Sequence, residues 1–445
     1  MKQHRLRKLA VAAAALALVG FAGTARSAGV TLPPGNTVEQ WDKIAEDTVV
    51  GSGAFQIEGL LYMSYTSTAM YDAITSIQGG YKPLLPSFRA SKQASPDAAA
   101  AEAAYRTLSS FFPSASGTLD PLYAQAMAAI PDGPAKLAGQ KVGRVAAAQV
   151  IRMRTGDGLT TPIGVTSTFP TLTPGPGVWR ETPAAYQAPQ TPWIANVHPF
   201  ILKSGSQFLP APPPALSSQQ WADSFNEIKT YGGVNSTART PDQTATAMFY
   251  SANVVRQYNR LVRDVADSKS LDLLQTARLT AMVNVVAEDA GIAVMYAKYH
   301  YLFWRPVTAI DPTSVTTDGF GPTPGFNDGN AATVEQAGWR PLLATPNHPE
   351  YPAAHATLTS AVGEVLQQFL GTAQINVDLH GFDPNGPAGN LNAVHHFATT
   401  ADLRTEVDNA RVWAGLHYRF SVDAGNTLGL SVAGYDLGRA FKSAK

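Results

Sequence analysis

The stretch SLDLLQTARLTAMVNVVAEDAGIAVMYAKYHYLFWR, residues 270–305, decides the fold class of this chain. It is the longest run with a helical pattern, and no proline interrupts it before Pro306. Proline disfavours helical backbone at the residue before it, so we expect one helix over 270–305 that ends there. A helix of this length indicates a mainly helical protein.

Helical patterns continue on both sides of this stretch. Ser217-x-x-Gln220 and Thr240-Pro241-x-Gln243 match the capping box, in which the two side chains cap each other's backbone N–H groups. Alternating strand patterns are scarce and short, and no fixed repeat is present. The predicted fold is therefore all-α, with one or more helical bundles and long irregular loops. The other expected helices cover 38–77, 95–112, 119–130, 134–154, a segment from 217, 240–261, a segment from 356, 399–418 and 425–442.

Three segments, at 155–215, 311–347 and 371–398, are expected to be irregular because they are rich in turn-forming residues. The first also contains scattered tryptophan and phenylalanine, which is typical of a lid or a wrapping segment. We divide the chain into a signal peptide over 1–28, an N-terminal helical region with this wrapping segment over 29–215, and a C-terminal helical bundle over 216–445. The last of these would carry the functional site.

The composition restricts the class of protein. Of 445 residues, 45% are hydrophobic and 15% are charged, as in globular proteins. A formal net charge of zero without a long basic run argues against nucleic acid as a partner. The absence of cysteine excludes disulfides and thiolate chemistry.

The N-terminus has the pattern of a secretory signal. Lys2, Arg5, Arg7 and Lys8 precede an apolar run over 9–22 that is followed by small residues. That run is too short for a confident membrane span. We expect an exported protein, periplasmic or secreted, with no stable membrane span after signal removal; a homo-oligomer is left open.

Lys298 and Arg305 are seven residues apart in the long predicted helix. This spacing places them on one face, about 10 Å apart along the axis. Their neighbours are apolar and aromatic, and burying two cations there is unfavourable without a nearby negative charge. A pair of surface side chains that extend their charges to water is the alternative.

The segment Asn347–Thr357 is a turn that runs into a helical pattern. Pro352 suits the first position of a helix, which would leave the N–H groups of Ala353, Ala354 and His355 unpaired. Such a helix start attracts anions, and His355 would stand beside the anion as a proton donor or acceptor. The alternative is an ordinary helix start with a surface histidine.

Arg411 and His417 form a third pair, six residues apart. A straight helix would not align them, although the long arginine side chain could reach the same ligand. A structural ion pair is the alternative for these two residues. Taken together, three cations, free helix amides and two imidazoles match a tetrahedral, multiply charged oxyanion, with one histidine at its centre and one that moves protons.

These residues also stand in the order of a family pattern: Lys298…Arg305-Pro306, then Pro352-Ala353-Ala354-His355, then Arg411…His417. In this the chain resembles the vanadium-dependent haloperoxidases and the related type 2 phosphatidic-acid-phosphatase-like acid phosphatases. The resemblance covers about residues 240–430 by motif and the whole mature chain more loosely. The pattern is specific for the family and not for the reaction.

The resemblance implies a role for each of these residues. His417 would be the axial ligand of vanadate, or the nucleophile that becomes phosphorylated in a phosphatase. Lys298, Arg305 and Arg411 would neutralise the oxyanion, and the N–H of Ala354 would donate to it. His355 would be the acid–base. The substrates would be hydrogen peroxide and a halide, which give hypohalite, or a phosphomonoester; phosphate could occupy the vanadate site.

Two positions depart from the family pattern. The family usually has Ser-Gly where this chain has Ala353-Ala354, so a hydroxyl contact to the oxyanion is missing. The phosphatase pattern often places Asp four residues beyond the second histidine, where this chain has Ser421. A carboxylate that orients His417 could come from Asp423, Glu288 or Asp289, which the sequence does not decide.

His348 favours the peroxidase, because bromoperoxidases of this family carry a second histidine seven residues before the acid–base and the chloroperoxidases carry Phe. The alternative is that His348 merely belongs to the loop that positions the helix. We therefore expect a haloperoxidase that oxidises bromide. The rivals are a phosphomonoesterase and a non-catalytic oxyanion-binding protein.

Two further patterns carry no function in our interpretation. The residues Asp378, His380, Asp383, His395 and His396 could bind a cation, but their spacing matches no standard metal site, and a solvated loop is the expectation. The glycines of 319–325 do not follow a strand, which argues against nucleotide binding.

Overall fold

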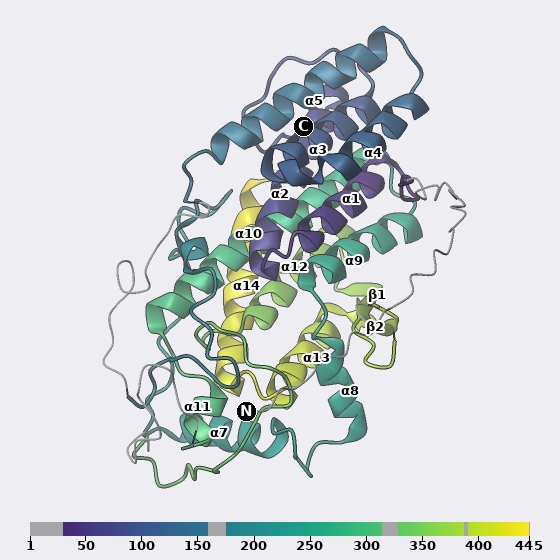
Figure 1. Ribbon diagram of the computed structural model, residues 1–445. Helices are drawn as coiled ribbons and strands as arrows, with labels where there is room; N and C mark the ends of the chain where they lie inside the picture. The colour runs from purple at the N-terminus through teal and green to yellow at the C-terminus, as the bar shows by residue number, and fades with distance from the viewer. Residues whose placement is uncertain (1–29, 159–174, 314–327, 387–389, 445) are drawn as a thin grey trace, which may run out of the picture.

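A computed structural model of the chain describes residues 30–158, 175–313, 328–386 and 390–444 (Figure 1). In these ranges the chain folds into helices and a single two-stranded sheet. The predicted all-α class is therefore confirmed, with that small sheet as an addition. The predicted signal peptide lies outside the described residues.

Helix α10 (Leu273–Tyr301) runs through the middle of the molecule and packs against α2 (Gln56–Gln78), α9 (Val254–Ser268), α12 (Ala354–Leu370) and α14 (Arg419–Arg439) (Figure 1). A capping box of Asp272 and Gln275 starts it. By length and composition alone α10 could cross a membrane, but 94% of its most apolar window is buried inside the protein. Such a helix, apolar on all sides, is the core of the bundle.

The N-terminal helices gather at one end of the molecule (Figure 1). Here α3 (Pro96–Phe111) and α5 (Pro134–Met153) pack closely, since Gly143 of α5 lies where a Cβ atom would come within 2.4 Å of the carbonyl oxygen of Ala99. Alanine on one helix and glycine on the other thus allow the two backbones to approach each other. The other elements of this end are α1 (Thr37–Gly51), η1 (Pro113–Ala115) and α4 (Ser116–Ala129), while η2 (Pro192–Asn196) packs against α10.

The opposite end holds α7 (Gln219–Tyr231), α8 (Pro241–Phe249), α11 (Pro306–Ile310) and α13 (Thr400–Trp413) (Figure 1). An aromatic cluster fills it, centred on Trp221 of α7. The Trp221 ring lies 5.8 Å from Trp304, 5.9 Å from Phe303 and 5.0 Å from Tyr418, centroid to centroid. Because these neighbours adjoin Arg305 and His417 in sequence, the candidate site borders an apolar wall.

Several predicted boundaries were wrong. The predicted helix over 38–77 is two helices, α1 and α2, and the one over 240–261 is also two, α8 and α9. The Thr240 capping box is present, whereas α7 begins one residue later than predicted, with Ser218 as its cap and no capping box. A periodic apolar pattern does not show a break of a few residues between helices that share the same core.

Residues 371–398 were predicted to be irregular, and this was wrong for most of the segment. Strands β1 (Gln374–Gly381) and β2 (Ala393–Thr399) form an antiparallel hairpin in which Val377 pairs with Phe397. Along β1 the side chains alternate between exposed and buried, with Ile375, Val377 and Leu379 inside. The turn-forming residues between the strands concealed this short alternation.

Two boundaries near the candidate site also differ from the prediction. Helix α10 ends at Tyr301, because Leu302 adopts a left-handed conformation with φ 48°, and Arg305 caps α11 instead. Helix α12 begins at Ala354 with Ala353 as its N-cap, so Pro352 precedes the helix and does not occupy its first turn. The division of the chain at residue 215 stays a prediction.

Candidate oxyanion site

The structure brings the predicted site residues together from five places in the fold. Lys298 lies in the last turn of α10, Arg305 at the start of α11, His355 in the first turn of α12, Arg411 in the last turn of α13, and His417 between α13 and α14. All five side chains are buried. The turn after α13, at Gly415 with φ 77°, places His417 near Arg411 although the two would not align on one helix.

Lys298 is held by backbone carbonyl groups of the turn before α12. Its Nζ donates to the carbonyl oxygens of Pro349 at 3.1 Å, Glu350 at 2.7 Å and Pro352 at 2.5 Å. Burial, followed by the neighbouring charge of Arg305, lowers the pKa of Lys298 well below its usual value. The ammonium group is therefore fixed, and it lies in a positive environment.

Arg305 joins the same turn to the turn that carries His417. Its Nε donates to the carbonyl oxygen of His348 at 2.9 Å, and its Nη1 donates to that of Leu416 at 3.1 Å and lies 3.5 Å from His417 Nε2. Its Nη2 donates to Nδ1 of His348 at 3.0 Å. Burial lowers the pKa of Arg305 to about 10. The structure thus places His348 beside Arg305, next to the cations.

Arg411 Nε and His355 Nε2 are buried nitrogens that lack a hydrogen-bond partner within the described part of the chain. The Arg411 side chain donates from Nη1 to the carbonyl oxygen of Tyr250 at 3.2 Å, and burial and Arg305 lower its pKa to about 9. Burial, then Arg411 and Lys298, lower the pKa of His355 well below its usual value. Both residues therefore retain hydrogen-bonding capacity within a cluster of cations.

The start of α12 supplies backbone donors, as predicted for Ala354 but not for Ala353. The N–H of Ala353 donates to the carbonyl oxygen of Ser421 at 3.0 Å, which makes the prediction of a free amide there wrong. Helix α12 has no side-chain cap, because its N-cap is an alanine. Its first-turn N–H groups, beginning with that of Ala354, therefore have no acceptor on the cap residue.

The carboxylate beside His417 is Glu350, a residue that the sequence analysis missed. His417 Nδ1 lies 2.8 Å from Glu350 Oε1, and the N–H of Tyr418 donates to the same oxygen at 3.1 Å. Burial raises the pKa of Glu350 to about 7, against the opposing effects of Lys298 and Arg305. Burial and the nearby cations lower the pKa of His417 well below its usual value.

The carboxylates that the sequence suggested for this role are engaged elsewhere. Glu288 pairs with Arg154 at 2.9 Å, and Asp289 accepts the N–H groups of residues 200–202 at 2.7–2.9 Å. Asp423 is exposed on α14, where burial raises the pKa of its carboxyl group, Arg419 opposes this and Glu227 adds to it. The available signal for Glu350 was its position between Pro349 and Pro352, in the turn whose carbonyl groups hold Lys298.

The charges of this site do not balance. Glu350 is the carboxylate that acts on Lys298 and Arg305, and no carboxylate is among the described groups that act most strongly on Arg411. A buried excess of positive charge is unfavourable unless an anion compensates it. Together with the unpaired nitrogens of Arg411 and His355, this shows that the residues present fit a tetrahedral oxyanion such as vanadate or phosphate.

Three histidines outside the cationic cluster, His380, His395 and His396, each pair with one carboxylate. His396 contacts Asp378 at 2.8 Å, His380 contacts Asp264 at 3.2 Å, and His395 contacts Glu406 at 2.6 Å. Across the described ranges no group of three or more histidine, cysteine or acidic residues could hold a metal ion. The expectation of a solvated loop is wrong for these residues, because Asp378 and His380 lie on β1 and His395 and His396 on β2.

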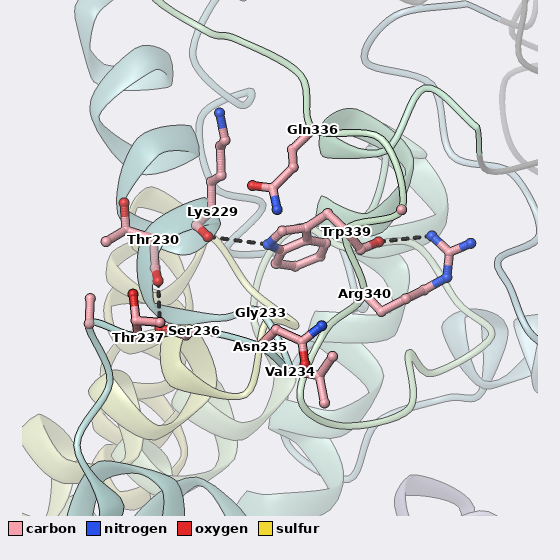
Figure 2. A pocket seen from close by; sticks show the side chains of 12 residues that line it. Lys229, Thr230, Gly233, Val234, Asn235, Ser236, Thr237, Gln336, Trp339 and Arg340 are labelled. Atoms are coloured by element: carbon pink, nitrogen blue, oxygen red, sulfur yellow. Dashed lines mark hydrogen bonds between the residues drawn. The ribbon is translucent and has the colours of Figure 1, made fainter.

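A separate cavity of about 320 Å³ lies beside α7 (Figure 2). Trp339 forms one side of it and donates from Nε1 to the carbonyl oxygen of Lys229 at 3.2 Å, and Arg340 lies next to it in the chain. None of its lining residues belongs to the cationic cluster. This cavity is therefore distinct from the oxyanion site.

Comparisons with known proteins agree with the predicted relationship. Residues 278–444 match the family described as the VCPO second helical-bundle domain. The vanadium chloroperoxidase of Curvularia inaequalis is 27% identical over 298 residues, which are 53% of this chain and 48% of that protein. The chain thus aligns with about half the length of this curated relative.

Two solved structures share the fold. A bacterial vanadium-dependent iodoperoxidase superposes with a TM-score of 0.68 at 19% identity, covering 93% of this chain and 99% of that one. A holo-type bacterial vanadium-dependent chloroperoxidase gives a TM-score of 0.67 at 17% identity, covering 91% and 97%. The resemblance to the vanadium haloperoxidases is confirmed, and so is the helical-bundle fold; the relationship to the acid phosphatases stays a prediction.

Proposed function

We propose that this relative of the vanadium haloperoxidases is a vanadate-dependent haloperoxidase that uses hydrogen peroxide to oxidise a halide, with bromide favoured. The observation that carries the proposal is the buried excess of positive charge formed by Lys298, Arg305 and Arg411. A trivalent or divalent oxyanion would compensate this charge, whereas a neutral substrate would not.

Vanadate would be held by these three cations, by the N–H of Ala354 and by Nε2 of His417. The bound group supplies a Lewis acid that activates peroxide without a change in oxidation state. The side chains of Lys298 and Arg305 are already fixed by backbone carbonyl groups, so they hold their positions before the ligand binds.

His355 supports the proton transfer. Its lowered pKa keeps the imidazole neutral at neutral pH, so that Nε2 can accept a proton from hydrogen peroxide and return it later. The same nitrogen is buried and has no partner within the described protein. A neutral base in a cationic site also avoids adding a further positive charge before the proton arrives.

His348 supports the preference for bromide. It lies with its Nδ1 on Arg305, and its ring centroid is 6.0 Å from that of Phe55. A halide that approaches the oxyanion from this side would meet a neutral imidazole, since burial lowers the pKa of His348 well below its usual value. Exchange of His348 for phenylalanine is therefore expected to alter the halide preference.

A phosphomonoesterase is the second candidate, favoured by the pairing of His417 with Glu350. A histidine whose Nδ1 donates to a carboxylate presents a nucleophilic Nε2, and phosphate fits the same cations. A non-catalytic oxyanion-binding protein is the third, for which Ala353 and Ala354 are the motivating residues. We also propose export after removal of residues 1–28.

Three activities of the purified protein separate these candidates. Peroxide-dependent bromination that requires orthovanadate supports the haloperoxidase. Hydrolysis of nitrophenyl phosphate that vanadate inhibits supports the phosphatase. Vanadate binding without either turnover supports the non-catalytic protein. Omission of peroxide is the control for the first assay, and boiled protein is the control for the second.

A further inference from the structure

The structure shows a carboxylate beside His417 that comes from an unexpected part of the chain. We propose that Glu350 is the positioning residue of His417, and that it replaces, from the turn before α12, the acid that the family pattern often places at the position of Ser421. The inference deepens the proposed function, since it rests on His417 facing the oxyanion.

Two donors fix the Glu350 carboxylate. Oε1 lies 2.8 Å from His417 Nδ1 and accepts the N–H of Tyr418 at 3.1 Å. The Glu350 and His417 side chains are 0% and 2% exposed, so water does not compete for this contact. In its ionised form the Glu350 carboxylate can only accept, so in that form Nδ1 of His417 carries the proton and Nε2 keeps its lone pair.

The other ring nitrogen of His417, Nε2, then faces the cations. Nε2 lies 3.5 Å from Nη1 of Arg305, which always carries its protons. A lone pair on Nε2 is the form that binds vanadate or attacks a phosphoryl group. The contact with Glu350 therefore selects the tautomer that the site requires.

Ser421 occupies the place from which the usual acid would act. Its hydroxyl and Oε2 of Glu350 are both buried without a hydrogen-bond partner of ordinary geometry. Ser421 nevertheless lies near enough to Glu350 to contribute to lowering the pKa of that carboxyl group. Two carboxylates there would repel each other, so an acid at 421 and an acid at 350 are alternatives.

The backbone of Glu350 makes two further hydrogen bonds, which substitution of the side chain leaves intact. Its carbonyl oxygen accepts from Lys298 Nζ at 2.7 Å, and its N–H donates to the carbonyl oxygen of Phe303 at 2.9 Å. Because both contacts involve main-chain atoms, substitution of Glu350 tests the carboxylate alone. This property makes the position suitable for a double exchange with Ser421.

The test compares Glu350→Ala, Glu350→Gln and the double variant Glu350→Ala/Ser421→Asp with the wild-type protein. Nitrogen-15 NMR of the histidine rings reports the His417 tautomer, and calorimetry with orthovanadate reports affinity. We expect Glu350→Ala to lose the fixed tautomer and at least about tenfold in affinity. Glu350→Gln, which keeps an accepting oxygen, should lose less, and the double variant should regain both properties.

The surface exchange Glu364→Gln on α12 is the control and should leave both readouts unchanged; Glu364 accepts from Gln368 on the same helix. A wild-type tautomer and wild-type affinity in Glu350→Ala would overturn the proposal. So would a double variant that folds and regains neither. If Glu350→Ala does not fold, Glu350→Leu, which fills the space without any hydrogen-bond acceptor, decides by the same two readouts, and wild-type values there would overturn the proposal.

Failure of the proposed function gives a different result. Wild-type protein that binds no vanadate contradicts that function, whereas the NMR measurement on the vanadate-free protein still shows whether Glu350 selects the His417 tautomer. The two outcomes are therefore distinguishable.

Discussion

Arg154 and Arg411 are both buried arginines, each 3% exposed, but their surroundings are opposite. Arg154 pairs with Glu288 at 2.9 Å and with Asp157 at 3.1 Å. Arg411 has no salt bridge among the described residues, and its Nε lacks a partner.

The pKa values of the two arginines reflect this difference. Burial acts to lower both, yet Glu288 and the other anionic groups raise the pKa of Arg154, while Arg305 adds to the lowering for Arg411, to about 9. The first cluster is compensated within the protein, whereas the second has an excess of positive charge that we propose an oxyanion compensates. A buried charge that lacks an internal partner thus marks the functional site.

The largest expected effect is the loss of turnover on substitution of His417. His417→Ala should reduce turnover below detection, because it removes the nitrogen that we propose binds vanadate or attacks a phosphoryl group. Steady-state bromination and phosphatase assays measure the loss, with circular dichroism to show that the variant is folded. Turnover close to wild type would remove His417 from the mechanism.

Substitution in the cluster of Arg154, Asp157 and Glu288 should lower the stability of the protein. Arg154→Met leaves Glu288 buried without its partner, so we expect the free energy of unfolding to fall by about 3–5 kcal/mol. Urea denaturation measures the change. Arg144→Met is the matched control, since Arg144 pairs with the buried Glu102 but is itself 48% exposed, and it should cost about 1 kcal/mol or less. Equal losses in both variants would contradict the distinction.

Substitution of Arg411 by methionine should reduce vanadate affinity more than it reduces stability. Arg411→Met removes a cation from a positive cluster and one hydrogen bond, so without added anion the free energy of unfolding should change by no more than about 1 kcal/mol. Affinity for vanadate should fall by about 2 kcal/mol, since a charge-assisted contact is lost. A large destabilisation with unchanged affinity would make Arg411 a structural residue like Arg154.

A smaller gain is expected at the N-cap of α12. Ala353→Ser adds the hydroxyl group that the relatives usually carry, and affinity for vanadate should rise by about 1 kcal/mol. The new hydroxyl could instead cap the helix, which would raise stability without anion and leave affinity unchanged. Calorimetry and thermal unfolding of the same variant separate these two results.

An effect of similar size is expected from pH. His355 has a pKa below its usual 6.5 when folded and an ordinary one when unfolded, so its protonation favours the unfolded state as the pH falls. Between about pH 7.5 and about pH 5.5, wild type should lose about 1.4 kcal/mol relative to His355→Asn. The difference between the two denaturation curves, measured without added oxyanion, isolates this group. A constant difference would mean that His355 titrates normally.

The sequence predicted the helices and the oxyanion residues through different kinds of information. The long apolar pattern of 270–305 and the cap at Thr240 are local, so α10 and the start of α8 were predictable. Arg305 lies outside the expected helix because Leu302 adopts a left-handed conformation. Leucine rarely takes this conformation, so the sequence does not predict the end of the helix there. Arg305 still lies beside the other site residues, because the turn between α10 and α11 positions it as well as the helical spacing would.

Glu350 shows what the sequence could not supply. Its partner His417 is 67 positions away, and only the packing of the turn before α12 against the turn after α13 brings them together. The suggested candidates Glu288 and Asp289 were attractive because they lie on the same helix as Lys298. They serve instead in the compensated cluster near Arg154, a division that residue types alone do not reveal.

Calorimetric titration of the purified protein with orthovanadate tests the central claim most directly, namely that Lys298, Arg305 and Arg411 form a site for a tetrahedral anion. The account predicts one vanadate per chain, competition by phosphate, and a weaker association in Arg411→Met than in Arg154→Met. An absence of binding, or binding that Arg411→Met leaves unchanged, would contradict it.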